Sequence, residues 1–329
     1  MPLYDTHKRL IDYLRISVTD RCNLSCFYCK PRAAMKTLSH REILSYEEII
    51  RLVALAVPLG ISRVRVTGGE PLVRRGIIDF IASLHSIEGL QDISITTNGV
   101  LLEEMAEGLI SAGKLRLNVS LDSLKPGTFR QITGSDNFDR VWRGINRAEE
   151  LGFSPIKINM VPVRGMNDTE AADFARLTLD RKLHVRFIEY MPIGADKRWY
   201  KDACIPSSEI RAVIEREVGP LKPFCSGNSA GPSDNYQLPD AQGVIGFISP
   251  ITRHFCESCR RLRLTADGKL KTCLFSDEEI DLKEVLRNGG TDDDLREQLL
   301  VAIRKKPERH PINTPQFKKC QRHMSAIGG

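Results

Sequence analysis

The feature of this sequence that most limits its possible folds is a regular alternation of short apolar strands and helical stretches between residues 14 and 191. The predicted strands span residues 14–19, 62–67, 92–97, 115–121, 155–161 and 185–190. The predicted helices between them span residues 46–57, 77–87, 101–112, 138–151 and 168–180, and Ser45 and Glu48 form a capping-box pattern before the first. Six successive strand–helix units indicate parallel strands joined by right-handed crossovers. They predict either an open α/β sheet or a partial barrel.

The distribution of polar residues along the strands separates these two architectures. In the first predicted strand the apolar residues occupy one face, and Arg15 and two hydroxyl residues occupy the other. The next four strands repeat this division. An open sheet covered by helices on both faces would be apolar throughout, and a closed eight-stranded barrel is packed with aliphatic side chains. The sequence therefore predicts an incomplete six-stranded (β/α)6 barrel, a partial TIM barrel, with a wet interior.

The polar faces of these strands carry repeated basic residues. Arg15, Arg65 and Lys157 lie on three of them, and together they predict a cationic interior. Such an interior favours a large anionic substrate, such as a nucleotide with its phosphates. The sixth strand, residues 185–190, does not alternate cleanly, and its inward face stays unassigned.

Beyond residue 191 the pattern changes to an α+β arrangement. Helices are predicted at residues 206–218, 282–286 and 292–304, and strands at residues 244–249 and 262–265. We therefore predict two domains: a barrel at residues 1–192, and a C-terminal extension at residues 193–329.

Three cysteines form a compact loop directly after the first predicted strand. Cys22, Cys26 and Cys29 have the spacing C-x3-C-x2-C. Each thiolate can bond one iron of a cubane iron–sulfur cluster, which leaves the fourth iron without a protein ligand, whereas structural zinc and ferredoxin-type sites use four protein ligands. The alternatives are a structural zinc loop, in which Cys22 would be surplus, and cysteines buried as small hydrophobic residues. We favour a reactive, incompletely ligated cluster.

A second group of three cysteines lies in the predicted extension, at Cys256, Cys259 and Cys273, and no fourth cysteine follows a pattern near it. Strand alternation places Arg261 and Arg263 on one side, next to this group, and arginine suits contacts with phosphates and base edges. A zinc site completed by His254 or by a distant cysteine remains open here. We favour a second incompletely ligated cluster beside a cationic rim.

Composition limits the class of protein. The chain has 329 residues, a net charge of +6 and nine cysteines, an odd number that suits a secreted disulfide protein poorly. No run of 18 apolar residues and no signal-peptide pattern occurs, so we expect a soluble cytoplasmic protein. The basic residues are dispersed, which makes the indication of nucleic-acid binding weak.

Two glycine-containing motifs add to this prediction. Gly68 and Gly69 follow the second predicted strand and let the backbone approach a ligand, and Glu70 can accept a hydrogen bond from a cationic amine. The sequence ends in Gly328 and Gly329. Such an end is normally frayed, but two glycines can also enter a narrow cavity that no side chain would fit.

These motifs carry a resemblance to a known family. The cysteine loop with Tyr28 before its last cysteine resembles that of the radical S-adenosylmethionine enzymes, and Gly68-Gly69-Glu70 matches their motif for the amino group of S-adenosylmethionine. Further matches at residues 96–99, 118–122 and 186–191, at the second cysteine group with its arginines, and at the terminal glycines extend the resemblance over nearly the whole chain. The chain resembles the GTP 3′,8-cyclases, a family of lyases that act first in molybdenum cofactor biosynthesis.

The resemblance implies a specific chemistry. Each cysteine group would hold a [4Fe–4S] cluster, the first binding S-adenosylmethionine and the second binding the guanine of GTP. Reductive cleavage of S-adenosylmethionine would give a 5′-deoxyadenosyl radical, which abstracts the C3′ hydrogen of GTP. Attack of the ribose radical on C8 would then lead to (8S)-3′,8-cyclo-7,8-dihydroguanosine 5′-triphosphate.

The resemblance also implies site residues and partners. The expected contacts to S-adenosylmethionine are Tyr28, Gly68, Gly69, Glu70, Ser120 and Met191. The expected contacts to GTP are Arg15, Arg65, Thr96, Lys157, Arg186, Arg261, Leu262 and Arg263, and Gly328 and Gly329 would assist turnover. The implied partners are an electron donor such as flavodoxin and the downstream cyclic pyranopterin monophosphate synthase, with no nucleic acid or membrane, and the protein would be a monomer or homodimer.

Two other functions remain as alternatives. A radical S-adenosylmethionine enzyme that modifies peptides can carry additional clusters, although such enzymes typically contain more cysteines. A zinc-binding nucleic-acid module is the alternative from a different class, and the regular strand–helix alternation argues against it.

Overall fold

The computed structural model describes residues 2–29, 37–193, 201–225, 231–310, 312, 314, 317 and 320–328. The strands in these residues are β1 (Tyr13–Ser17), β2 (Arg63–Thr67), β3 (Asp92–Thr97), β4 (Leu115–Ser120), β5 (Ile156–Met160), β6 (Leu183–Ile188), β7 (Lys222–Pro223), β8 (Asp234–Gln237), β9 (Val244–Ile248), β10 (Arg261–Leu264), β11 (Lys269–Lys271) and β12 (Ile280–Asp281). The α-helices are α1 (Tyr46–Ala56), α2 (Ile77–His85), α3 (Leu102–Ser111), α4 (Pro126–Thr133), α5 (Phe138–Glu150), α6 (Ala171–Asp180), α7 (Ser207–Glu217), α8 (Leu282–Arg287), α9 (Asp292–Arg304) and α10 (Met324–Ile327).

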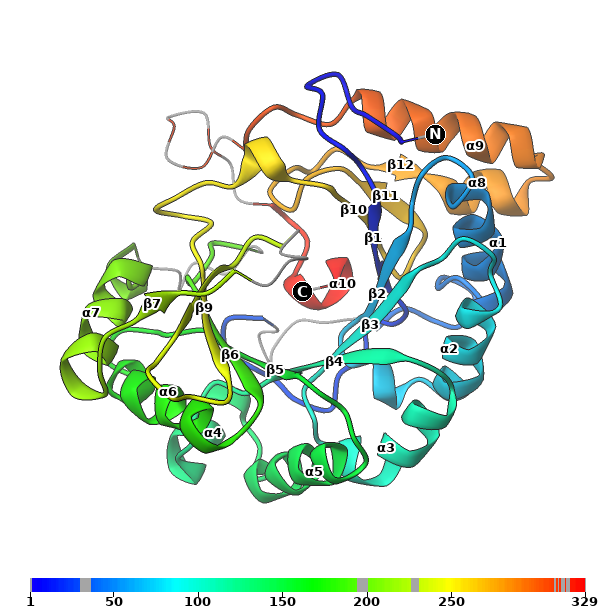
Figure 1. The fold of residues 1–329 in the computed structure, drawn as a ribbon. Helices are drawn as coiled ribbons and strands as arrows, with labels where there is room; N and C mark the ends of the chain where they lie inside the picture. The colour runs from blue at the N-terminus through cyan, green and yellow to red at the C-terminus, as the bar shows by residue number, and fades with distance from the viewer. Residues whose placement is uncertain are drawn as a thin grey trace.

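All of these strands belong to one sheet, with the order β12-β11-β10-β1-β2-β3-β4-β5-β6-β9-β8-β7. Strands β1 to β6 pair in parallel, each with the next. Strand β9 continues this parallel pairing beyond β6, and β10 continues it beyond β1. The sheet curves around a central space, and α1 to α6 lie on its outer side (Figure 1). The residues after β6 therefore extend both edges of the sheet that the first six strands form.

The strand–helix alternation predicted from the sequence is present. Within the described residues, each of the six predicted strands lies within two residues of an observed one, and the predicted helices correspond to α1, α2, α3, α5 and α6. The capping box of α1 is confirmed, because Ser45 Oγ accepts from the Glu48 N–H at 3.2 Å and Glu48 Oε2 accepts from the Ser45 N–H at 2.7 Å.

Helix α4 was not predicted from the sequence. Its residues, Pro-Gly-Thr-Phe-Arg-Gln-Ile-Thr, have low intrinsic helix propensity, and no side chain caps its N-terminus. Burial of Phe129 and Ile132 against the protein stabilises it instead. The short strands β7, β8, β11 and β12 were also missed, since sequences of two to four residues are too short to show strand periodicity.

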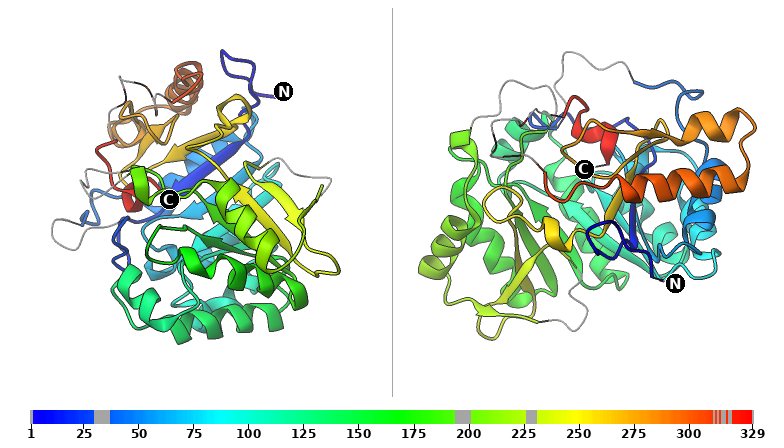
Figure 2. Two further views of the ribbon diagram at one scale, coloured as in Figure 1. Left: turned by 90° about the vertical axis from the view of Figure 1, so that its left-hand side faces the viewer. Right: turned by 90° about the horizontal axis from the view of Figure 1, so that it is seen from above.

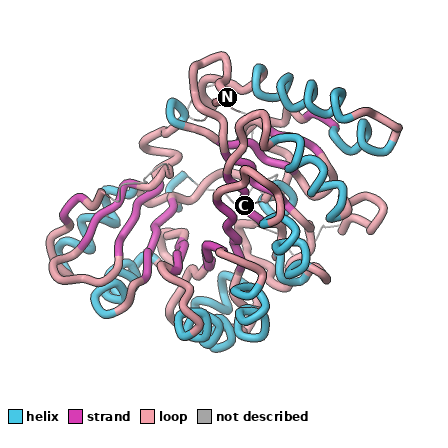
Figure 3. The backbone as a smooth tube through the Cα atoms, turned by 45° about the vertical axis from the view of Figure 1, so that its right-hand side comes forward, coloured by secondary structure: helices cyan, strands magenta, loops and turns pink. Residues whose placement is uncertain are grey.

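The core lies between the sheet and the outer helices. Apolar residues of successive strands, including Ile16, Val66, Ile95 and Ile158, are fully buried there. Figure 3 shows the helices outside and the strands inside this layer. On β6, Val185 and Phe187 join the core, so the inward face that the sequence left unassigned carries the alternating residues His184, Arg186 and Ile188.

The end of the chain enters the space inside the sheet. Figures 1 and 2 show α10 within the curve formed by the strands rather than on the outer surface. Ile327 is fully buried, and Gly328 lies so close to β2 that a Cβ atom there would be 2.3 Å from Thr67 Oγ1. Within the described residues, every helix is too short or too polar to cross a lipid bilayer.

Candidate active site

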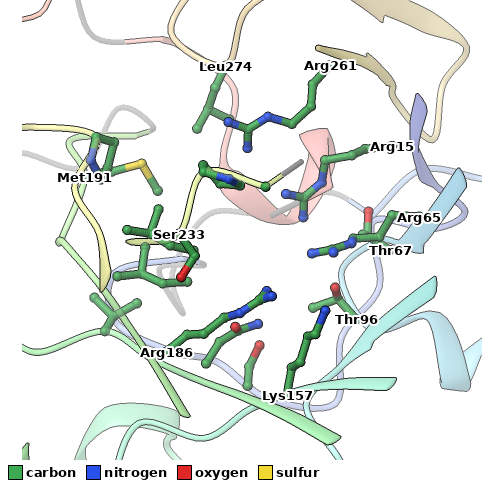
Figure 4. Close-up of a pocket in the computed structure, with 18 of the residues that line it drawn as sticks. Arg15, Arg65, Thr67, Thr96, Lys157, Arg186, Met191, Ser233, Arg261 and Leu274 are labelled. Carbon is green, nitrogen blue, oxygen red and sulfur yellow. The ribbon is translucent and has the colours of Figure 1, made fainter. Parts of the chain in front are cut away.

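A cavity of about 770 Å³ lies inside the curve of the sheet. The polar faces of β1 to β6 line it, as strand alternation predicted. Figure 4 shows Arg15, Arg65, Lys157 and Arg186 pointing into this space from different strands. Predicted site residues that line it are Arg15, Cys22, Cys26, Tyr28, Cys29, Arg65, Gly68, Gly69, Glu70, Thr96, Ser120, Lys157, Arg186, Met191, Cys256, Cys259, Arg261, Arg263 and Cys273.

The two cysteine groups lie at opposite ends of the strands. The first group follows the carboxyl end of β1, whereas Cys259 precedes β10, whose Arg261 pairs with Tyr13 at the amino end of β1. Cys273 follows β11, which is antiparallel to β10, and therefore lies at the same end as Cys259. Strand β1 alone spans roughly 13 Å, at about 3.3 Å per residue. The cavity therefore extends from one cysteine group to the other.

Backbone contacts fix the first cysteine loop. The Gly69 N–H donates to Thr19 O at 2.6 Å, and the Glu70 N–H donates to Arg21 O at 2.7 Å. A Cβ atom on Gly69 would lie 2.3 Å from Arg21 O, and one on Gly68 would lie 2.7 Å from Thr19 O. The two glycines thus allow their backbone to pack against the segment that leads into Cys22.

Glu70 is almost fully buried beside this loop. Its carboxylate accepts from Thr97 Oγ1 at 2.7 Å, from the Asn98 N–H at 2.6 Å and from the Leu72 N–H at 3.0 Å. Burial raises the pKa of Glu70 to about 7, although these hydrogen bonds favour the charged form. The Asn98 side-chain amide also lies 3.6 Å from Cys22 Sγ. Glu70 therefore connects the end of β3 to the cysteine loop.

A second acidic group faces the same loop. The Tyr28 hydroxyl donates to Asp122, whose other carboxylate oxygen accepts from the Val161 N–H at 2.8 Å. Burial raises the pKa of Asp122 to about 6 and that of Tyr28 well above its usual value. Ser120 precedes this acid on β4 and also lines the cavity.

Two buried cations hold the second cysteine group. Lys306 Nζ donates to Arg261 O at 2.9 Å and to Thr272 O at 2.6 Å, so it joins the strand after Cys259 to the residue before Cys273. Arg9 Nη1 donates to Cys256 O at 3.0 Å. Burial alone would raise the pKa of Cys259, but Arg261 and Lys306 lower it to about 6.

Both cysteine groups are present as thiols rather than disulfides, and thiolates are ligands for iron–sulfur clusters as well as for zinc. No disulfide joins the nine cysteines, all of which are described residues. Across the described ranges, no three His, Cys, Asp or Glu side chains are arranged to hold a metal ion. Ligands of one zinc, at 2.3 Å from it, lie within roughly 4 Å of one another, whereas the thiolates of an iron–sulfur cluster bind separate irons. The alternative zinc ligand His254 packs against His310, with ring centroids 4.4 Å apart, and its Nδ1 lies 2.9 Å from Pro250 O.

The cations of the cavity wall repel one another. Burial and then the charge of Arg186 lower the pKa of Lys157 to about 6. Burial and then the charge of Arg65 lower the pKa of Arg186 to about 9. Burial, Arg263 and Arg65 hold the pKa of Arg15 well below its usual value. An anionic ligand would relieve this repulsion, so the wall is suited to a polyanion.

The remaining predicted residues have different positions. Thr96 Oγ1 is buried and has no hydrogen-bond partner among the described residues. The Leu262 side chain lies in the core rather than at the cavity. Gly328 O accepts from Arg263 Nη1 at 2.6 Å, and Gly329 lies outside the described residues.

Sequence reasoning missed several polar residues of the wall. Tyr13, Arg116, His184, Ser233 and Asn235 also line the cavity. Continuing the alternation backwards from Arg15 would have found Tyr13. No periodic signal marks Ser233 and Asn235, because they lie in or next to β8, a strand of only four residues.

Two family models match the chain. Residues 16–178 match the model described as "Radical SAM superfamily", and residues 183–312 match "Molybdenum Cofactor Synthesis C". The chain is 48% identical over 326 residues to a GTP 3′,8-cyclase of Thermodesulfovibrio yellowstonii, with 99% of each chain covered. It is also 48% identical over 329 residues to a GTP 3′,8-cyclase of Geobacter sulfurreducens, with 100% of each chain covered.

Solved structures show a related fold. Streptococcus suis SuiB, both alone and bound to S-adenosylmethionine, has a TM-score of 0.50 and 19% sequence identity with this chain. The similarity covers 64% of this chain and 47% or 48% of the SuiB chains. At this identity the likeness concerns the fold alone.

Proposed function

The chain belongs to the family of GTP 3′,8-cyclases, and from that premise we propose how its cavity performs the family's reaction. It is a radical S-adenosylmethionine enzyme of the first step of molybdenum cofactor biosynthesis, in which GTP becomes (8S)-3′,8-cyclo-7,8-dihydroguanosine 5′-triphosphate. The observation that carries the proposal is one cavity with a cysteine group at each end and a cationic wall between them.

The proposed architecture is an incomplete (β/α)6 barrel with a C-terminal extension. The parallel pairing of β1 to β6 and the helices outside them support it. In this proposal residues 1–192 form the barrel, and residues 193–329 supply strands at both edges, the second cysteine group and the tail.

The first cysteine group holds a [4Fe–4S] cluster, which family membership implies together with S-adenosylmethionine. When bound, these groups supply the one-electron chemistry that starts the reaction. Glu70 accepts a hydrogen bond from the amino group of S-adenosylmethionine. Three protein donors already contact its carboxylate, which has about four acceptor positions, so one position remains. The further contacts to S-adenosylmethionine in this proposal are Tyr28, Gly68, Gly69, Ser120 and Met191.

The second cysteine group holds a second [4Fe–4S] cluster, on Cys256, Cys259 and Cys273. Its position at the other end of the cavity supports a role in binding the guanine. Arg261 and Arg263 extend from the adjoining strand toward the same space. Leu262 contributes through its backbone alone, because its side chain is in the core.

The cations between the two cysteine groups bind the triphosphate and the ribose region. Arg15, Arg65, Lys157 and Arg186 supply the positive charge, and the buried Thr96 hydroxyl supplies a hydrogen bond that no described residue takes. Together they hold GTP across the cavity, so that C3′ faces the first cysteine group while the guanine faces the second.

The C-terminal tail positions Arg263 in this arrangement. The Gly328 carbonyl accepts from the Arg263 guanidinium, and the contact with Thr67 leaves no room for a side chain at residue 328. Gly329 is proposed to assist turnover together with Gly328. The electron donor such as flavodoxin, the downstream cyclic pyranopterin monophosphate synthase, the cytoplasmic location and the monomeric or homodimeric state stay predictions.

Metal analysis and one substitution test the proposal. Protein purified without oxygen should contain about eight irons with matching sulfide and no zinc, as expected for two [4Fe–4S] clusters. Arg65→Ala should weaken GTP binding by tenfold or more, the loss expected for about 1.5–3 kcal/mol of charged hydrogen bonding, and leave the iron content unchanged. Arg130→Ala, in an exposed ion pair with Asp136, is the matched control.

Each contrary result removes a different part of the proposal. Four irons and one zinc would make the second cysteine group structural. Unchanged GTP affinity in Arg65→Ala would remove Arg65 from the substrate site. Absence of iron after anaerobic reconstitution would overturn the function as a whole.

A further inference from the structure

A recess over Gly246, in the wall formed by β6, β8 and β9, is occupied by three polar side chains. A Cβ atom on Gly246 would lie 2.3 Å from Ser233 Oγ, 2.9 Å from His184 Nε2 and 3.0 Å from Asn235 Oδ1. In the sheet, Gly246 pairs with Arg186 of β6 on one side and with Asn235 of β8 on the other. Polar atoms from two segments, His184 of β6 and the stretch from Ser233 to Asn235 that runs into β8, therefore converge on the space that the missing side chain of Gly246 leaves to them.

These three atoms lack hydrogen bonds that such buried groups normally make. Ser233 Oγ, His184 Nε2 and Asn235 Oδ1 are buried, and none makes a hydrogen bond of normal geometry with the described residues, although Asn235 lies close enough to His184 to affect its pKa. His184 is only 8% exposed. Because buried polar groups are almost always paired, the recess is suited to a polar ligand. All three side chains line the cavity, and Figure 4 shows Ser233 beside the space into which Arg186 and Lys157 point.

The recess is neutral, but it adjoins two cations. Burial and the charges of Arg186 and Lys157 lower the pKa of His184 to about 2, and Asn235 offsets this only in part. The imidazole is therefore uncharged at neutral pH. Lys157 is the direct neighbour of His184 across the β5–β6 pair. The imidazole, the hydroxyl and the amide can each donate one hydrogen bond, the amide after turning about its last bond. Neutral donors thus add contacts to an anion without adding to the repulsion between the cations.

This combination of neutral donors and adjoining cations fits the end of a phosphate chain. A terminal phosphate presents three acceptor oxygens, whereas a base edge would leave the charge of Lys157 and Arg186 unmatched. We propose that His184, Ser233 and Asn235, gathered over Gly246, bind the terminal phosphate of the nucleotide and so make the site select a triphosphate. This inference rests on the proposed function, because it takes GTP as the ligand of the cavity.

Equilibrium binding to the cluster-loaded protein tests the inference. GTP, GDP and GMP are titrated into the wild type, Asn235→Ala and Ser233→Ala. Each substitution should weaken GTP binding about tenfold, the loss expected for one hydrogen bond to a charged group. Binding of GDP and GMP, which end one and two phosphates earlier, should not change.

Two further comparisons guard against misfolding. Asn288→Ala and Ser83→Ala replace the same residue types at exposed positions far from the cavity in the fold, and should leave all three affinities unchanged. Gly246→Ala keeps all three donors but displaces them, because its Cβ atom would overlap Ser233 Oγ, and it should reduce the preference for GTP over GDP. Iron content and melting temperature are measured for each variant.

The outcomes separate the two levels of inference. Loss of GTP affinity without loss of GDP affinity supports the subsite. Equal weakening of GTP and GDP, or no change in either, overturns it while GTP binding by the wild type preserves the proposed function. Failure of the wild-type protein to bind GTP overturns both.

Discussion

The two cysteine groups differ in how the chain assembles them. The first lies on one short loop, and the backbone of the next motif packs directly against the segment before it. The second combines residues on either side of β10 and β11, and two buried cations from distant parts of the sequence, Arg9 and Lys306, join its segments.

Their electrostatic surroundings differ as well. At the first group, burial and the neighbouring groups Cys29, Asp122 and Cys22 raise the pKa of Cys26 well above its usual value. At the second, Arg261 and Lys306 lower the pKa of Cys259 to about 6 despite its burial. The comparison shows that a local site depends on close backbone packing, whereas a site assembled from distant segments depends on buried charge.

Removal of one thiol from each group should give the largest effect and separate their roles. Cys26→Ser should lose about four irons and all reductive cleavage of S-adenosylmethionine, because the first cluster loses a ligand. Cys259→Ser should also lose about four irons, but keep that cleavage while losing GTP-dependent product. Iron analysis and assay of S-adenosylmethionine consumption test this, and equal loss of cleavage in both variants would contradict the division of roles.

Backbone packing at the first group can be disturbed without touching a cysteine. In Gly69→Ala the added methyl group would overlap Arg21 O, so the loop must shift, at a cost of about 1–3 kcal/mol in the free energy of unfolding. Iron should be lost from the first group only. Gly127→Ala is the control, since a Cβ there meets nothing within 4 Å. Equal iron content in the two variants would show that close packing is not required.

Loss of the buried charge at the second group should have an effect of the same order. Lys306→Met keeps the side-chain length but leaves two backbone carbonyls without their donor, which costs about 1–3 kcal/mol for each buried group left unpaired. Iron should be lost from the second group while the first keeps its own. The exposed neighbour Lys305→Met is the control. Retention of eight irons in Lys306→Met would mean that the thiols alone assemble the site.

A change of pH should give the smallest effect, through Glu70 beside the first group. The pKa of Glu70 is raised to about 7, so this carboxyl becomes protonated as the pH falls from 8 to 6 and loses the charge that attracts an amino group. Affinity for S-adenosylmethionine should fall by up to about tenfold, because the charged fraction of a carboxyl with a pKa of about 7 falls from about nine-tenths to about one-tenth over this range. Glu70→Gln should bind more weakly and flatten the profile. An unchanged slope in this variant would assign the pH dependence to another group.

Much of the site could be predicted because its signals are local. The spacing of Cys22, Cys26 and Cys29, and the alternation that turns Arg15, Arg65 and Lys157 to one face, depend only on neighbouring residues. The family followed from such motifs and is confirmed by relatives 48% identical over nearly the full chain.

The sequence by itself determined the strand–helix order, the polar inner face of the first strands and the residue types that can ligate iron, because periodicity and spacing encode them directly. Only the tertiary structure decided that β9 and β10 extend both edges of one sheet, that Lys306 joins the two halves of the second cysteine group, and that His184 meets Asn235 over Gly246. These contacts join residues far apart in the chain. Their energy depends on burial and on pairing across the sheet, which no short stretch of sequence specifies.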